Sequence, residues 1–494
     1  MTEPSVGELR GQIRQWRRGR ADTRLLQVLE DAYVAVFAAV MGLSVAVSVV
    51  LRLRNDLEAV CRTATCHQAR SVLPLVLALA VLTGCVVLAR LFGPMLVSPA
   101  VASWLLAAPV DRTRLLRPRL FVTALGAMVP GGVAVAGVAA LAGYDAGSVA
   151  ALGAAQGLLC VLVVGSLTVA QALRPGMATA VGRVLAAVTW GLLAGLTLGL
   201  LPRFASAEAG ASVPAAVVVA VLVVAGLAAV ALWRAADVLP LIPRDRLTPG
   251  GTLAPGLSGA LGTLDLALAY DVLLGRHWQA RSTVASRPAR GTGIWPLVWR
   301  DLIRLRRRPR LLVLLAAAAV VPFLAAELGL ERLVLPVAAI TGLVAGLDLF
   351  SALRVLSRTP GLVRCLPQPG WQVRAACCLV PAVPLLVWGV ATAPAMQAAL
   401  GGPWAVALGT GATAGAAAVV GAMRWMTGRP PNYQLPLVSS PMGAVPPTLY
   451  LSVFRGIDVT VLVTVPVLVA PTVRGVEVAL GLAAVIAAIL LARD

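Results

Sequence analysis

The chain has 494 residues, of which 59% are hydrophobic and only 13% are charged, and its formal net charge is +20. Soluble domains carry roughly a quarter charged residues, so this composition excludes a soluble globular protein and predicts a polytopic membrane protein. All 41 basic residues are arginine. Without lysine, the chain cannot form a phosphate-binding loop that ends in Gly-Lys-Ser/Thr, or a lysine Schiff base.

Two segments rich in arginine and tryptophan each precede a series of apolar segments. The first lies within residues 1–31 (LRGQIRQWRRGR), and the second occupies residues 294–310 (IWPLVWRDLIRLRRRPR). Arginine suits the anionic inner leaflet and tryptophan suits the headgroup layer. Each segment is therefore predicted to be a helix that lies on the membrane surface and leads into a span. The predicted anchoring residues are Trp16, Arg17, Arg18, Trp295, Trp299, Arg300, Arg304 and Arg307.

Twelve apolar segments approach the length of about 20 residues that crosses a bilayer. The first of them begins about thirty residues into the chain and is followed by others, so it is not a cleavable signal peptide. The sequence thus predicts an all-α membrane protein with about twelve transmembrane helices in two six-helix units. The predicted spans are 32–51, 72–92, 120–142, 147–171, 184–201, 214–233, 311–326, 333–353, 376–396, 404–423, 459–471 and 478–492.

The loop after the first span contains Cys61 and Cys66. This loop is predicted to lie outside, where a disulfide can persist, so the sequence favours a bridge between the two. His67 and His277 lie too far apart for a His-Glu-x-x-His metal helix, and no serine-hydrolase or paired-carboxylate motif occurs. The sequence therefore predicts no metal, no cofactor and no catalytic centre.

The loops after the second and eighth spans are long and rich in arginine. The first (SPAVASWLLAAPVDRTRLLRPR) predicts a short amphipathic helix, and the second is SRTPGLVRCLPQPGWQVR. A short helix that projects from the membrane surface suits docking of a soluble partner, although an ordinary basic anchoring loop has the same composition. Recurrence in both units favours docking. The candidate coupling residues are Trp104, Pro109, Arg112, Arg114, Arg364, Pro367, Trp371 and Arg374.

The two units match in order and spacing. The dipeptide Leu-Phe ends equivalent spans at residues 91–92 and 349–350, 258 residues apart, and Pro109 and Pro367 follow at the same offset. Because each unit has an even number of spans, the units are predicted to be parallel copies that arose by internal duplication.

Two irregular segments separate or interrupt the units, which occupy residues 32–234 and 311–494. The linker, residues 235–293, is loop-rich at first (IPRDRLTPGGTLAPGLSG) and then helical in period (LDLALAYDVLLGRHW), which predicts an interfacial helix. Residues 427–450 contain six prolines, which exclude a continuous helix. The first unit has only a short counterpart of this proline-rich segment, so the two units are not expected to have identical functions.

The arginines determine the predicted orientation. With the N-terminus inside, the outer loops hold seven arginines and seven acidic residues, while the other 34 arginines and 14 acidic residues lie inside. The net charge then falls on one face, as the positive-inside rule requires, and both termini are cytoplasmic. Anionic lipid accounts for this basic face, so no nucleic-acid binding is inferred. Arginine without lysine, with abundant alanine, valine and glycine, indicates a GC-rich bacterial genome and the bacterial cytoplasmic (inner) membrane.

Charged residues are nearly absent from the predicted spans. Asp348 and Asp458 lie near inner ends, Arg183 opens a span, and Glu327 lies near an outer end. Ion-coupled carriers usually place carboxylates or histidines at mid-depth, so the sequence disfavours a proton-driven antiporter. A secondary carrier of 6+6 design and a non-transporting membrane scaffold or assembly protein are the alternative interpretations.

The chain resembles permease subunits of the type-2 class of ABC exporters, in a fused two-unit form of a bacterial family. Residues 105–119 (LLAAPVDRTRLLRPR), 264–278 (LDLALAYDVLLGRHW) and 295–310 carry the resemblance. It implies that the two arginine-bearing loops are coupling helices that contact a separate ATPase subunit, itself a homodimer. It also implies that the fused halves enclose a path for an unidentified substrate. The chain departs from the class because it lacks an extended outer loop between the fifth and sixth spans.

Overall fold

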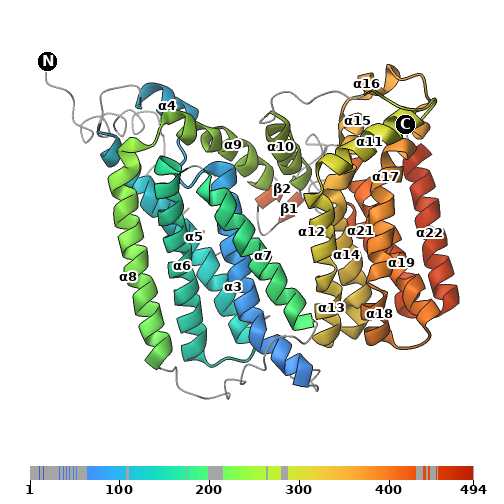
Figure 1. The fold of residues 1–494 in the computed structure, drawn as a ribbon, viewed down its shortest axis with the longest axis horizontal. Coiled ribbons are helices and arrows are strands. Elements are labelled where there is room, and N and C mark those ends of the chain that lie inside the picture. Colours follow the sequence, from blue (N-terminus) through green and yellow to red (C-terminus); the bar gives the residue numbers. More distant parts are fainter. Residues whose placement is uncertain are drawn as a thin grey trace. The chain divides into compact units, whose positions relative to one another are not determined.

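A computed structural model describes residues 64–106, 111–174, 176–197, 215–262, 265–279, 288–429, 438–440, 443–445 and 454–492, with a few isolated residues outside these ranges. Nearly all of the described elements are helices (Figure 1). Within the described ranges, ten helical segments are long and apolar enough to cross a membrane. The prediction of an all-helical, multi-pass membrane protein is confirmed.

The helices cluster into two compact units, and the division between Pro255 and Gly256 falls inside the helix α9 (Arg244–Gly262), most of which belongs to the first unit. In the first unit, α5 and α6 each begin at an aspartate whose side chain accepts hydrogen bonds from the first turn. Its elements are α3 (Ala64–Phe92), α4 (Pro99–Trp104), α5 (Arg112–Leu141), α6 (Ala146–Leu173), α7 (Met177–Thr197), α8 (Ala215–Val238), the 3₁₀ turn η1 (Leu239–Leu241) and α9 (Arg244–Gly262).

The second unit is also helical, apart from a short antiparallel β-ribbon. This ribbon lies in the proline-rich segment, residues 427–450, for which the sequence predicted no continuous helix. In this ribbon Val438 pairs with Val445. The elements are α10 (Leu266–Gln279), α11 (Trp295–Arg307), α12 (Arg310–Ala318), α13 (Val320–Glu327), η2 (Glu331–Leu333), α14 (Val334–Gly346), η3 (Leu347–Phe350), α15 (Ser351–Arg358), α16 (Pro360–Arg364), α17 (Gly370–Ala391), α18 (Ala393–Leu400), α19 (Trp404–Met426), β1 (Val438–Ser440), β2 (Gly443–Val445), α21 (Ile457–Val469) and α22 (Val473–Ala492).

The predicted spans that fall within the described ranges coincide with helices. The eleventh corresponds to α21, which at 13 residues is shorter than an ordinary span. The predicted first span lies almost entirely outside the described ranges. The side chains of six predicted site residues also lie outside them: Trp16, Arg17, Arg18, Cys61, Cys66 and Pro109.

Each unit is built around one central helix. In the first unit α6 packs against α3, α5 and α8, and in the second α19 packs against α14, α17 and α22. The helices in these three pairs correspond in chain order between the two units. The second unit buries its central helix more completely, because α14, α17, α21 and α22 all contact α19.

Glycine brings the central helix of each unit against its neighbour, backbone to backbone. A Cβ atom at Gly132 of α5 would lie 2.8 Å from the Gly153 carbonyl oxygen of α6, and one at Gly389 of α17 would lie 2.5 Å from the Gly411 carbonyl oxygen of α19. Small residues allow such approach between membrane helices, where dispersion contacts replace the hydrophobic drive.

The glycines of the central helices repeat along the chain. Gly153 and Gly411 are 258 residues apart, as are Gly157 and Gly415. A Cβ atom at Gly157 would lie 3.1 Å from the Met128 carbonyl oxygen, and one at Gly415 would lie 2.7 Å from the Leu385 carbonyl oxygen. The offset that the Leu-Phe dipeptides share thus also relates two close helix contacts.

The segment that was expected to be loop-rich, at the start of the linker, is helical, so this expectation was wrong. It forms α9, and the residues that indicated a loop serve packing instead. A Cβ atom at Gly250 would overlap the backbone of Phe92, and one at Gly251 would overlap the backbone of Val97. These glycines allow α9 to lie directly on the chain between α3 and α4, and sequence alone does not distinguish this use from a turn.

Replacing Gly389 with alanine is expected to destabilise the protein by at least about 2 kcal/mol, because the new methyl group would meet backbone atoms that cannot turn aside. Gly137→Ala in α5 is the control, since no atom lies within 4 Å of the added Cβ. Thermal unfolding of the full chain in neutral detergent measures both. Equal melting temperatures for the two variants would contradict the glycine-packing interpretation.

Candidate functional site

The short helix α4 and the residues just before it are held against α9 by two hydrogen bonds to main-chain carbonyls, at one end of the first unit (Figure 1). The Val97 amide donates to the Leu247 carbonyl at 3.2 Å, and Arg244 Nη2 donates to the Ala102 carbonyl at 2.6 Å. The arginine thereby binds a carbonyl in the body of α4 itself. A helix of six residues is not stable alone, so α4 depends on these bonds for its position.

Beyond α4, the chain turns into α5 through an aspartate cap with arginine beside it. The Asp111 carboxylate accepts from the Thr113 amide at 2.9 Å and lies 3.3 Å from Arg114 Nε. Arg112 is half-buried, whereas Arg114 is exposed. Trp104 at the end of α4 is 79% exposed, which is unusual for the largest side chain. The predicted coupling loop therefore presents an aromatic ring and a guanidinium outward.

The corresponding loop of the second unit contains α16, between α15 and α17. Arg364 and Pro367 are exposed, and Trp371 is 54% exposed. Arg374 differs from these residues because its Nη1 donates to the Leu491 carbonyl at 3.1 Å, which ties α17 to α22. Three of the four predicted coupling residues in this unit thus face outward, and the fourth is a packing contact.

The amphipathic helix α11 leads into α12, as predicted. Trp295, Arg300 and Arg307 are exposed, in keeping with a surface helix. Trp299 instead has the Arg290 guanidinium over its ring, 5.2 Å from the ring centre. The described part of the predicted anchor therefore includes three exposed residues.

Arg304, predicted as an anchor, instead points into the unit. Its Nη1 donates to the Ser351 hydroxyl at 2.9 Å, and its Nη2 donates to the Leu349 carbonyl at 2.5 Å. These bonds connect α11 to η3 and to the first residue of α15. The amphipathic pattern alone does not separate an arginine that meets lipid headgroups from one that meets a buried carbonyl.

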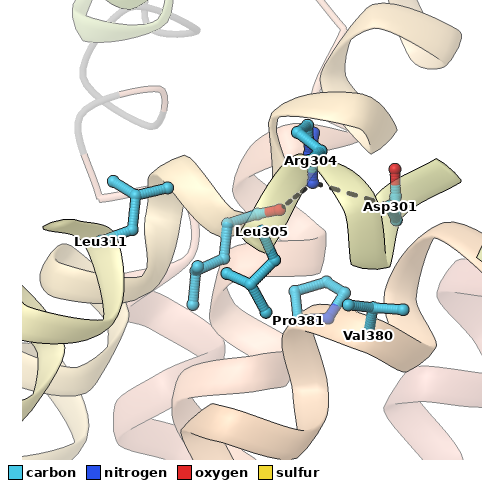
Figure 2. Close-up of a pocket in the computed structure, with 7 residues that line it drawn as sticks. Asp301, Arg304, Leu305, Leu311, Val380 and Pro381 are labelled. Carbon is cyan, nitrogen blue, oxygen red and sulfur yellow. Dashed lines mark hydrogen bonds and ion pairs between the residues drawn. The ribbon is translucent and has the colours of Figure 1, made fainter. Parts of the chain in front are cut away.

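A buried carboxylate lies one turn before Arg304. Asp301 is 1% exposed, and neither of its oxygens accepts a hydrogen bond from a described residue, although Arg304 Nη2 lies 3.7 Å from Oδ2. A cavity of about 10 Å³ adjoins the pair, which is enough for about one water molecule. Figure 2 shows Arg304 between the carboxylate and a main-chain carbonyl oxygen, above Val380 and Pro381.

Burial raises the pKa of the Asp301 carboxyl above its ordinary value, and Arg304 and Arg300 oppose the rise. A raised pKa in the folded state gives stability that is present at low pH and is lost as pH increases through the raised value. Asp301 therefore weakens the folded state near neutral pH.

Asp301→Asn is expected to stabilise the chain by about 1 kcal/mol at neutral pH, because the amide needs no ionised form in this buried site. The gain should shrink as pH falls through the raised pKa. Melting temperatures across that range measure it, with Asp111→Asn as the control, since asparagine caps a helix equally well. A variant that loses stability relative to the wild type as pH rises would contradict the assignment.

A second charged cluster joins α10 to the core of the second unit. Arg354 is 1% exposed, and its Nε and Nη2 each lie 2.8 Å from an oxygen of Asp271. Its Nη1 donates to the Met426 carbonyl at 3.3 Å, and its guanidinium lies 5.5 Å from the Trp425 ring centre. Arg358 Nη2 lies 3.1 Å from the same carboxylate. Arginine alone fits this planar, two-pronged arrangement.

A neighbouring group of side chains extends this cluster toward α12. Asp348 accepts from the Tyr270 hydroxyl at 2.9 Å and from Arg308 Nη2 at 3.0 Å. The Arg308 guanidinium also lies 5.9 Å from the Trp278 ring centre. Burial and then the Asp348 charge raise the pKa of Tyr270, so this phenol stays a donor. The helix predicted in the linker is thus docked on the second unit by polar contacts.

Arg354→Gln is expected to cost about 3 kcal/mol, because it leaves buried polar groups without their partner. Arg358→Gln, which also contacts Asp271 but is 29% exposed, should cost no more than about 1 kcal/mol. Thermal unfolding of the purified chain compares the two directly. Equal losses of stability in the two variants would show that the buried position of Arg354 does not add to the stability of the fold.

The sequence interpretation missed Arg354, the residue with the densest set of buried contacts. Only its position in the sequence could have indicated its role. Arg354 lies four residues after the Leu-Phe dipeptide, near the end of an apolar run, where an arginine needs a carboxylate partner. Asp271, in the helix predicted for the second part of the linker, supplies it. Among the described residues, no group of three His, Cys, Asp or Glu side chains is placed to hold a metal ion.

The apolar helices, surface helix α11 and arginine clusters define a multi-pass α-helical membrane protein. A family model described as a family of unknown function, DUF6297, matches residues 66–436, and the chain belongs to this family. No curated protein and no solved structure matches the chain.

Proposed function

We propose that the chain is the membrane-spanning permease subunit of an ATP-driven exporter of the type-2 ABC class, without ATPase activity of its own. The observation that carries the proposal is a short helix after corresponding long helices of the two units, α4 in one and α16 in the other. Exposed Trp104 and Trp371 adjoin these helices. Exposed tryptophan beside arginine is typical of a docking surface for a protein partner.

The proposal includes twelve spans in two parallel six-helix units, with both termini in the cytoplasm of a bacterium. It is supported by the shared contacts of α6 and α19 and by the glycines that repeat at an offset of 258 residues. The described arginine clusters of the second unit lie around α10, α11, α15 and α16, which the positive-inside rule assigns to the cytoplasmic side.

In this proposal α4 transmits movement of an ATPase subunit to the membrane helices. Arg244 and Leu247 hold α4 against α9, and α9 in turn lies on the chain beside Phe92 at the end of α3. Because the Arg244 side chain and the backbone contacts of Leu247 and Gly250 join these segments, displacement of α4 would move α3 and α9 with it. Such rigid coupling suits a switch between two packings of the membrane helices.

The carboxylates near span ends favour the exporter over an ion-coupled secondary carrier. Asp348 is held by Arg308, and Asp458 lies 3.1 Å from Arg424 Nε. A carboxylate that is neutralised by arginine in this way is a poor site for a coupling proton or sodium ion. A non-transporting scaffold would not require the hydrogen bonds that hold α4 against α9.

The double charge reversal Arg112→Glu and Arg114→Glu is expected to weaken binding of the ATPase subunit by about tenfold or more, because like charges then meet across the interface. Arg332→Glu with Arg474→Glu is the matched control, since both residues are exposed and lie at the opposite ends of their helices from the arginine clusters. Co-purification from native membranes and the ATPase rate of the purified complex measure the effect.

Loss of the ATPase subunit and of stimulated ATP hydrolysis in the first variant, with both kept in the control, is the expected result. An active transporter that purifies without any ATPase would contradict the proposal, as would flux driven by an ion gradient alone. Unchanged coupling in the first variant would remove Arg112 and Arg114 from the docking surface.

A further inference from the structure

Five arginines line one cavity in the second unit, although they are spread over more than ninety residues of sequence. The cavity has a volume of about 580 Å³, which is within the range of small-molecule sites. It lies where α15, α16, α17 and α19 meet the segments after α19 and before α21. The arginines are Arg364, Arg374, Arg424, Arg429 and Arg455.

The described lining of this cavity is strongly basic. Of the described residues that line it, none is acidic. Asp458 holds Arg424, but Arg374 and Arg455 donate to neutral main-chain carbonyls, those of Leu491 and Arg429. Burial lowers the pKa of Arg455, and the charges of Arg424, Arg354 and Arg358 lower it further. The charge of Asp265 only partly offsets this lowering. An anion in the cavity would relieve this repulsion.

The backbone is shaped to admit Arg455. A Cβ atom at Gly428 would overlap the Arg455 guanidinium, whose Nη1 donates to the Arg429 carbonyl at 2.6 Å. Glycine at this position therefore lets the guanidinium lie across the end of α19. Because its partner there is a neutral carbonyl, the remaining donors of the fork are suited to oxygen atoms of a ligand.

The same cavity has an apolar wall formed by Leu356, Val363 and Leu490. A site with guanidinium groups on one side and leucine and valine on the other matches a ligand with a phosphate and a hydrocarbon portion. Guanidinium groups bind phosphate oxygens in pairs, and basic pockets between membrane helices bind anionic lipid headgroups.

We propose that this cavity is a binding site for a phosphate ester, held by the five arginines against the apolar wall. The site is separate from the proposed docking loop of the first unit and does not require the exporter function. It gives Arg364 and Arg374 a role different from the coupling role that the sequence predicted. A phospholipid headgroup and a soluble phosphate share this chemistry, and the test separates them.

The test uses the full chain in neutral detergent at constant ionic strength. Its unfolding temperature is measured against dihexanoyl phosphatidylglycerol, dihexanoyl phosphatidylcholine and inorganic phosphate. Phosphatidylglycerol is expected to raise it in a saturable manner, and phosphatidylcholine is not. Arg364→Gln, at an exposed position, should raise the apparent Kd about tenfold. Arg474→Gln, on α22, removes the same charge elsewhere and should leave the Kd unchanged.

The outcomes distinguish the two sources of phosphate. Saturation by phosphatidylglycerol alone assigns the site to lipid, and saturation by inorganic phosphate that competes with it assigns the site to phosphate in general. Gly428→Ala keeps every charge but displaces Arg455, so it should also raise the Kd several-fold. No saturable effect of either anion, an equal effect of phosphatidylcholine, or unchanged Kd in both Arg364→Gln and Gly428→Ala would overturn the proposal.

Discussion

The backbone contact between α17 and α19 is the constraint on which the second unit depends. Gly389 and Gly411 remove the side chains that would otherwise keep the two helices apart. Close approach fixes the two helices relative to each other, and both reach the arginine-rich end of the unit. There α17 contributes Trp371 and Arg374, while α19 contributes Arg424. The positions of the proposed docking and anion-binding side chains thus follow from a contact that involves neither charge nor aromatic rings.

Arginines that point into the unit perform the second structural task, which is to attach surface helices to the membrane helices. Arg354 holds α10 through Asp271, and Arg304 holds α11 through the Leu349 carbonyl. A charged group is expensive to bury, so each guanidinium is matched by carboxylate or carbonyl oxygen. Such contacts specify where a surface helix lies more sharply than apolar packing would.

Composition and span length were sufficient to predict a helical, multi-pass membrane protein, because hydrocarbon admits few charged residues. The surface helix at Trp295 was also predictable from its arginines and the apolar run that follows. Helix α9 was not, because Gly250 and Gly251 look like turn residues until the backbone that packs against them is known. Arg354 and the arginine-lined cavity depend on contacts between distant segments, which no local pattern contains.

Whether the chain works with a separate ATPase subunit through α4 can be measured with a photo-reactive amino acid in place of Trp104. After irradiation of native cells, a covalent product between this position and an ATPase subunit is expected. The same probe at Trp233, which is exposed on α8, should give none. Absence of any ATPase product from position 104, while the protein is made and inserted at its normal level, would rule out docking of an ATPase subunit at α4.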